Sequence, residues 1–211
     1  MVELIVDIKP LGIYSAHIKA PFDEGKETLN QAGYDIISLR DNAQLRMQQG
    51  TDSFVSKNGN WVREGVLYVR DKGTFLTKKS PIMANPQEAT EFHRVDLEFY
   101  LTAQQLEEAL EDSVKLSGDS IPTNRFAEDP VTVYAFGEVA EQYGAILSDN
   151  KLKEMRVWLA SPEDKPFARP MWFHKIISGN WRSGLVGDYR YLDGNNRVRG
   201  VRQGGEPPQK F

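Results

Sequence analysis

A long apolar segment, Asp129 to Leu147, sets the first constraint on the fold of this chain. Asp129 can cap a helix, because its carboxylate can accept hydrogen bonds from the free N–H groups of the first turn. Pro130 suits the first helical position, where its missing donor is not needed. Apolar residues then recur at helical spacing, so we predict one continuous helix over about 130–147, buried between other elements. The alternative is a strand over 131–136, which its β-branched residues favour, followed by a helix from Glu138.

Residues 91–116 show a strand pattern followed by a helix pattern. Apolar and charged side chains alternate over 91–101, which predicts a half-buried strand. Thr102 and Gln105 then match a capping box, and an apolar stripe with helical spacing follows them. These observations predict a second principal helix over about 102–116.

Turn residues between alternating segments predict three β-hairpins. The first joins strands over 2–8 and 13–19. The second joins 61–70 to 73–78 through a turn that contains a glycine. The third is expected over 184–202.

Shorter elements are expected between these hairpins. One helix is predicted over 23–31, and a second should begin after Ser38 and end near Gln49. Gly50 then stands in the position where glycine commonly ends a helix. The polar segment 51–60 is interpreted as a loop.

Hairpins outnumber strand–helix alternations, which indicates an α+β fold. We predict a mixed, mainly antiparallel sheet with the two principal helices packed on it. Residues 1–203 are interpreted as one domain, with a possible subdivision near 80–90. Residues 204–211 have the composition of a flexible tail.

Composition narrows the functional classes. The chain has no cysteine, which excludes disulfides and thiolate chemistry. No apolar window is long enough to span a membrane, and the N-terminus lacks the pattern of a secretory signal. We therefore expect a cytoplasmic protein without a membrane partner.

Charge is strongly segregated along the chain. Residues 86–150 carry 3 basic and 14 acidic side chains, whereas residues 151–211 carry 12 basic and 6 acidic ones. Segregation of this kind is typical of proteins that bind a polyanion or self-associate through unlike surfaces. It also arises when acidic helices pack beside a basic sheet within one chain.

Cationic and aromatic residues are interleaved in the C-terminal third. Cations neutralise phosphate groups, and aromatic faces stack on unpaired bases, so the mixture predicts a surface for nucleic acid or another phosphate-bearing ligand. The residues assigned to this surface are Arg169, Trp172, His174, Lys175, Trp181, Arg182, Tyr189, Arg190, Tyr191, Arg197 and Arg199. The alternative is that the aromatic residues are core and that the arginines are solvated or paired with the acidic middle segment.

A metal site is the main enzymatic hypothesis. Asp96 and Glu98 should share one face of the strand predicted over 91–101, and two such carboxylates can hold a divalent ion such as Mg²⁺. The alternative is that they form the solvated face of that strand. His174 is the best single candidate for an acid–base role, although no Ser/His/Asp pattern is present.

The sequence therefore supports three functional hypotheses. The most concrete is binding of nucleic acid or a phosphate-bearing ligand without a cofactor. The second is a non-catalytic, self-associating protein, in which the acidic middle of one copy meets the basic C-terminal part of another. The third is a metal-dependent phosphodiesterase or nuclease, although the sequence favours a protein that is not an enzyme.

Overall fold

The computed structural model describes residues 4–6, 13–117, 119–176, 183–188 and 191–203. The strands are β1 (Ile5–Val6), β2 (Ile13–Ala20), β3 (Asp35–Ile36), β4 (Asn60–Val69), β5 (Gly73–Thr77), β6 (Phe99–Tyr100), β7 (Ser113–Leu116), β8 (Ser120–Pro122), β9 (Glu154–Trp158), β10 (Phe167–Phe173), β11 (Gly184–Val186) and β12 (Asn196–Gln203). The helices are α1 (Phe22–Gln31), α2 (Leu39–Gln49), α3 (Phe54–Lys57), α4 (Pro81–Ala84), α5 (Pro86–Arg94), α6 (Ala103–Glu111), α7 (Pro130–Phe136) and α8 (Ala140–Asp149), with single 3-10 turns η1 (Thr123–Arg125) and η2 (Gly137–Val139).

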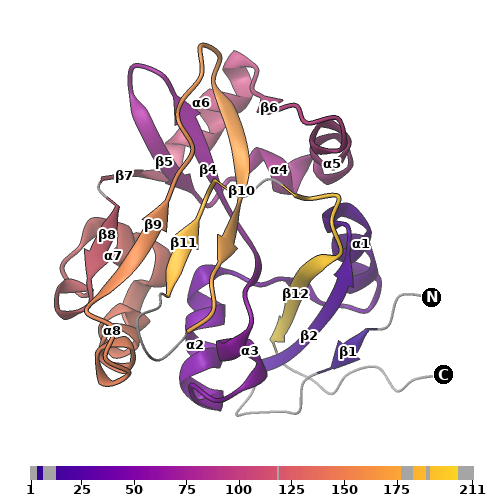
Figure 1. The fold of residues 1–211 in the computed structure, drawn as a ribbon. Helices are drawn as coiled ribbons and strands as arrows, with labels where there is room; N and C mark the ends of the chain where they lie inside the picture. Colours follow the sequence, from indigo (N-terminus) through magenta and orange to yellow (C-terminus); the bar gives the residue numbers. More distant parts are fainter. Residues whose placement is uncertain (1–3, 7–12, 118, 177–182, 189–190, 204–211) are drawn as a thin grey trace.

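The described strands join in one mixed sheet, which confirms the predicted α+β class. Its main path runs β1-β2-β12-β4-β10-β11-β9-β8, with β5 and β7 continuing from β4. Most neighbours are antiparallel, but β12 is parallel to β4 and β11 is parallel to β9. Figure 1 shows β12 beside β2, so the two ends of the chain meet in the sheet.

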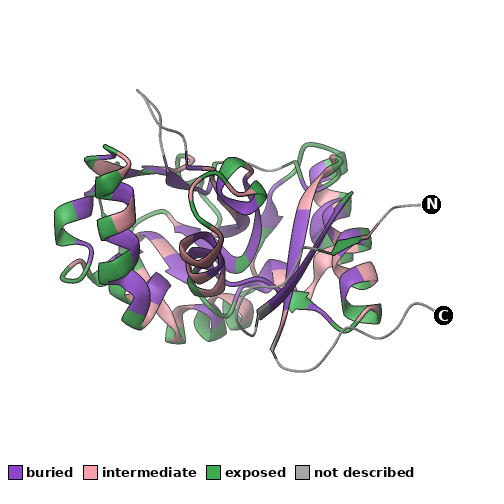
Figure 2. Ribbon diagram, turned by 90° about the horizontal axis from the view of Figure 1, so that it is seen from below, coloured by how far each residue is buried: buried purple, intermediate pink, exposed green. Residues whose placement is uncertain are grey.

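Helices cover the sheet on both faces. Neighbouring β4 residues alternate between two buried clusters, since Trp61 lies in one and Val62 in the other. The Trp61 cluster contains residues of α1, α4, α5 and α6, whereas the Val62 cluster contains residues of α2, α7 and α8. Figure 2 shows buried residues along the strands and exposed residues on the outer helix surfaces.

The apolar segment beginning at Asp129 is helical but not continuous. Asp129 caps α7 as predicted, with Oδ1 accepting from the backbone N–H groups of Val131 at 2.9 Å and Thr132 at 3.2 Å. Gly137 then adopts a left-handed φ of +58° and ends the helix. Because that backbone conformation suits glycine and interrupts the helical ladder, α8 begins anew at Ala140. The prediction of one continuous helix was wrong, as was the alternative of a strand over 131–136.

The helix predicted over 102–116 is shorter than expected. Its capping box is present, because Thr102 and Gln105 exchange hydrogen bonds. The helix ends at Glu111, and Ser113–Leu116 forms β7, which pairs with the edge of β5. Residues 113–116 continue the helical pattern of the sequence, but pairing with the free edge of β5 makes them a strand.

Two strand predictions near the functional candidates were wrong. Residues 91–94 continue α5, and a turn leads from there to the short β6. The alternation over 91–101 therefore led to a wrong prediction. Residues four apart share one face of a helix, and Ala89 and His93 of α5 are both buried on such a face. The segment 184–202 is not a hairpin, since β11 pairs with β10 and β9 while β12 pairs with β2, β3 and β4.

Other local predictions hold. The β4–β5 hairpin forms, with Gly73 at a left-handed φ of +105°. β1 and β2 pair antiparallel, although the turn predicted between them lies outside the described residues. Ser38 caps α2 by accepting from the N–H of Asp41, and Gly50 follows the last turn. No described helix is long and apolar enough to cross a membrane.

Candidate functional site

The predicted basic-aromatic surface is divided between the two faces of the sheet. Val198 of β12 is in register with Trp61 of β4, and both are buried in the same cluster. Arg197 and Arg199 flank Val198, so their side chains project from the opposite face. Trp172 of β10 lies on the Trp61 side, with the two ring centroids 5.0 Å apart. Cations and tryptophans that alternate in the sequence are therefore separated by the sheet.

Arg169 does not contribute a free cation to either face. Its Nε lies 3.0 Å from Glu98 Oε2 and its Nη2 lies 2.5 Å from Glu98 Oε1, with both side chains buried. Its Nη1 donates to the backbone carbonyl of Asp188 at 2.7 Å. The guanidinium is thus neutralised inside the protein, and its assignment to a binding surface is not supported.

The premise of the metal site is also wrong. Asp96 and Glu98 share no strand face, because Asp96 is exposed in the turn after α5 while Glu98 is buried against Arg169. Within the described residues, no group of three histidine and carboxylate side chains is placed to hold a metal ion.

The remaining predicted site residues have different surroundings. Trp172 is half-buried against Trp61, and the ring of His174 lies 5.8 Å from that of Trp158. Lys175 is half-buried, and Tyr191 is 60% exposed. Four predicted residues lie outside the described part of the chain: Trp181, Arg182, Tyr189 and Arg190.

Arg197 and Arg199 belong to a group of residues around Phe54, which we call the cationic cluster. The Phe54 ring lies 5.2 Å from Cζ of Arg197 and 5.8 Å from Cζ of Arg199, and it stacks on His17 with 4.5 Å between ring centroids. Lys19 completes the cluster, because it is directly opposite Arg197 on β2. Three basic side chains thus lie against one ring that is 42% exposed, and Lys19 lies next to Arg197 on the neighbouring strand.

The members of the cationic cluster differ in accessibility. Arg199 and His17 are buried, and Arg199 Nη1 donates to Ser15 Oγ at 3.0 Å. Lys19 is exposed and Arg197 is half-exposed. Among the described residues, no carboxylate pairs with Lys19 or Arg197, and Arg197 Nε is buried without a hydrogen-bond acceptor. The cluster therefore presents two accessible cations backed by two buried basic groups.

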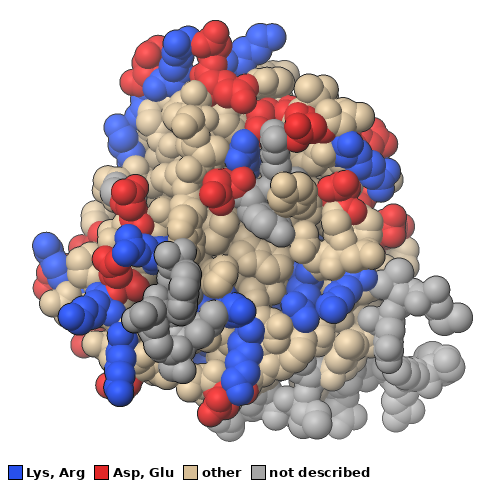
Figure 3. Space-filling view, in the orientation of Figure 1, with Lys and Arg blue, Asp and Glu red and all other residues tan. Residues whose placement is uncertain are grey.

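The charge distribution of the surface agrees with this arrangement. In Figure 3 basic side chains predominate in the lower half of the view, the region of β2, β12, α2 and α3 in Figure 1. The upper half shows side chains of both signs.

Only two of the five residues of the cationic cluster were predicted from the sequence. Arg197 and Arg199 were predicted, but His17, Lys19 and Phe54 were missed. On β2, Ala16 and Ile18 are buried in the core, while polar side chains alternate with them on the other face. That alternation was available as a signal. Phe54 had no such signal, because it lies on α3 within the segment interpreted as a loop.

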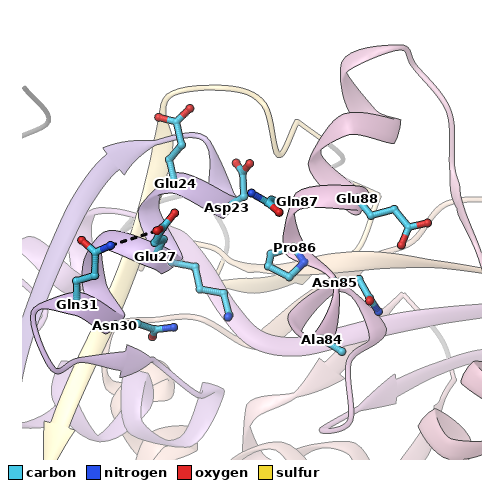
Figure 4. A pocket seen from close by; sticks show the side chains of 11 residues that line it. Asp23, Glu24, Glu27, Asn30, Gln31, Ala84, Asn85, Pro86, Gln87 and Glu88 are labelled. Carbon is cyan, nitrogen blue, oxygen red and sulfur yellow. Dashed lines mark hydrogen bonds between the residues drawn. The ribbon is translucent and has the colours of Figure 1, made fainter.

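The structure also has a groove of about 670 Å³ between α1 and α5. Figure 4 shows its lining, in which Asp23, Glu24 and Glu27 come from α1 and Glu88 comes from α5. Glu27 accepts a hydrogen bond from Gln31. The carboxylates of Glu24 and Glu88 point in different directions, so the groove does not gather its acidic groups around one point.

The fold places the protein in a structural class. No known protein family and no curated protein matches this sequence. One solved structure, described as "Accommodation of massive sequence variation in Nanoarchaeota by the C-type lectin fold", superposes with a TM-score of 0.68. The match covers 94% of this chain and 100% of that chain at 15% sequence identity. The chain therefore has a C-type lectin fold, and at this identity the likeness carries no assignment of ligand or activity.

Proposed function

We propose that this protein is a non-catalytic binding protein whose cationic cluster holds a ligand that carries phosphate groups, such as a single-stranded nucleic acid. The observation that carries the proposal is the pair of accessible cations, Lys19 and Arg197, which are opposed in register, with Arg197 next to the partly exposed ring of Phe54. The proposal moves the binding site from the whole C-terminal third to the face shared by β2, β12 and α3.

The chemistry of the cluster suits such a ligand. A guanidinium donates two parallel hydrogen bonds to a phosphate, and a lysine ammonium adds a point charge next to it. Phe54 offers an aromatic surface on which a base can stack, which contributes about 1–3 kcal/mol in single-strand binding proteins. The buried Arg199 lies against the same ring and adds positive potential, and His17 stacks on the ring.

The fold is consistent with a binding role. The solved neighbour is described as a C-type lectin fold that accommodates massive sequence variation. A scaffold whose core survives large changes elsewhere can carry different binding surfaces, since function resides in the site and not in the fold. We infer that the face around Phe54 is such a surface in this chain.

The test is a binding titration with a fluorescently labelled single-stranded oligonucleotide, at low and at moderate salt. We expect affinity to fall steeply as salt rises, because binding releases counterions from the phosphates. Arg197→Gln and Lys19→Gln should each weaken binding and each reduce the salt slope by about 1. Lys153→Gln is the matched control, since Lys153 is exposed on the loop before β9.

Two results would overturn the proposal. The first is an affinity that does not depend on salt, or no binding at low salt. The second is an equal effect of Lys153→Gln and Arg197→Gln, which would indicate a diffuse attraction without a site at the cationic cluster. A labelled duplex in parallel tells whether unpaired bases are needed for stacking on Phe54.

A further inference from the structure

Asn58 is followed by Gly59 in the connection between α3 and β4, and no other asparagine of the chain precedes a glycine. Asn58 comes directly after the last residue of α3 and is half-buried. Its Nδ2 donates to the backbone carbonyl of Phe54 at 2.9 Å. The side-chain amide of Asn58 thus closes the single turn of α3.

The structure gives each residue of this pair a separate reason. Gly59 is buried, and a Cβ atom at that position would lie 2.3 Å from Nε1 of Trp172. The packing of the Trp172 indole therefore leaves space for glycine alone. Asn58 supplies a donor to a carbonyl at the C-terminal end of α3, where the helix itself offers none. Packing and helix capping together place a glycine directly after an asparagine.

An asparagine in this position reacts with its own backbone. The backbone nitrogen of Gly59 attacks Cγ of Asn58, so a new N–Cγ bond forms and the Cγ–Nδ2 bond breaks. The proton of the attacking nitrogen leaves with the amide as ammonia. Water then opens the five-membered imide at either carbonyl, which leaves aspartate or isoaspartate at residue 58. Glycine favours the ring closure, because it has no Cβ beside the attacking nitrogen and its backbone rotates freely.

The folded backbone slows this reaction without preventing it. Ring closure requires rotation about ψ of Asn58 from its extended value of 136°, and the amide has to release the carbonyl of Phe54. Asn58 lies after the helical residues of α3, and β4 begins only at Asn60. The rotation therefore opens the connection between two elements and leaves the strand paired.

We propose that Asn58 is a site of spontaneous deamidation in the folded protein. The product is a carboxylate, which accepts hydrogen bonds but donates none, so it cannot bond to the carbonyl of Phe54. Phe54 carries the ring that lies 5.2 Å from Cζ of Arg197 in the cationic cluster. Deamidation thus removes the bond that closes α3 and places a negative charge one helical turn from Phe54, which lowers the positive potential there.

The first experiment incubates the natural chain in mildly alkaline buffer below its melting temperature and follows it by peptide mass mapping. Asn150 is the matched internal control, because it is half-buried at the end of α8 and its Nδ2 donates to the carbonyl of Ile146 at 2.8 Å, but Lys151 follows it. We expect the amide-to-acid mass gain at Asn58 at least about tenfold faster than at Asn150, since only Asn58 precedes a glycine.

Two results would overturn the proposal. The first is an equal rate of conversion at Asn58 and Asn150. The second is an unchanged Asn58 in the folded chain over the time in which the chain unfolded in urea converts. Both results are independent of any ligand, so failure of this proposal and failure of the proposed function are separate results.

The second experiment tests the effect of the modification on the cationic cluster, and this part rests on the proposed function. Asn58→Asp reproduces the aspartate product, and Asn58→Ser is the control that loses the amide without adding a charge. We expect Asn58→Asp to bind the labelled oligonucleotide at least about twofold more weakly than Asn58→Ser at low salt, where charges are least screened. Equal affinities of the two variants would overturn the link between deamidation and the cluster.

Discussion

Arg169 and Glu98 form a buried ion pair joined by two hydrogen bonds, between β10 and the turn that connects α5 to β6. The side chains are 10% and 3% exposed, so water contributes little to their solvation. The pair links the sheet to the turn between α5 and β6, whose backbone N–H groups also donate hydrogen bonds to the last turn of α5. Loss of one partner would leave the other charge buried without its ion-pair partner.

Removal of either partner should be strongly destabilising. We expect Glu98→Gln or Arg169→Met to lower the free energy of unfolding by about 3 kcal/mol, measured by chemical denaturation. The double variant should lose less than the sum of the two single losses, because no unpaired charge remains. Arg156→Met is the control, since Arg156 pairs with Glu154 on the surface. A loss in Glu98→Gln as small as in this control would contradict the finding.

Asp129 should stabilise α7 through its cap. Asp129→Ala removes the acceptor for two backbone N–H groups, and we expect a loss of about 1 kcal/mol in the free energy of unfolding. Asp129→Asn should retain most of the stability, because the amide oxygen can accept the same bonds. Asp149→Ala at the C-terminal end of α8 is the comparison, where removal of a negative charge should be neutral or slightly favourable. Equal losses at both positions would show that the cap is unimportant.

Predictions from the sequence succeeded where the signal is local. The caps at Ser38, Thr102 and Asp129 depend on residues within one helical turn, and all three form. Predictions failed where distant segments decide the structure. β12 and β2 pair although most of the sequence lies between them. No turn pattern near residue 196 indicates that β2 is the partner.

The same distinction explains the candidate site. Arg169 was assigned to the surface because it is interleaved with aromatic residues, and the interpretation of 91–101 as an amphipathic strand did not indicate Glu98 as its partner. Arg197 is half-exposed and stays a binding candidate, but its neighbours Lys19 and Phe54 come from β2 and α3. Only the sheet topology brings these three residues together. We found no short sequence motif in this chain that indicates its C-type lectin fold.

Gly59 makes room for the indole of Trp172. A Cβ atom at residue 59 would overlap the Trp172 ring, which is itself packed on Trp61. Gly59→Ala should therefore lower the free energy of unfolding by about 1–3 kcal/mol through overpacking, measured by denaturation. Trp172→Phe in the same chain should recover part of this loss, because the smaller ring leaves space for the methyl group. Additive losses in the double variant would show that the two residues do not compete for space.

Glu64 should make stability depend on pH. Its carboxyl is fully buried at the start of α2, where it accepts a hydrogen bond from the N–H of Leu39 at 3.0 Å. Burial raises the pKa of Glu64 to about 7, against the opposing effects of that hydrogen bond and of the charge on Arg63, and with a smaller raising effect from Asp41. The folded protein therefore holds this proton at pH values where the unfolded chain has released it.

The sign of the effect follows from proton binding. Between the ordinary pKa of a glutamate and about 7, the folded state binds more protons than the unfolded state, so the free energy of unfolding falls as pH rises through this window. Glu64→Gln keeps the shape of the side chain without a titrating group. It should match the natural chain near pH 4.5 and exceed it by about 3 kcal/mol above pH 8, measured by denaturation at several pH values. Glu107→Gln, at an exposed position on α6, should show no such divergence. A constant difference between Glu64→Gln and the natural chain from pH 4.5 to 8 would mean that Glu64 does not titrate in this range.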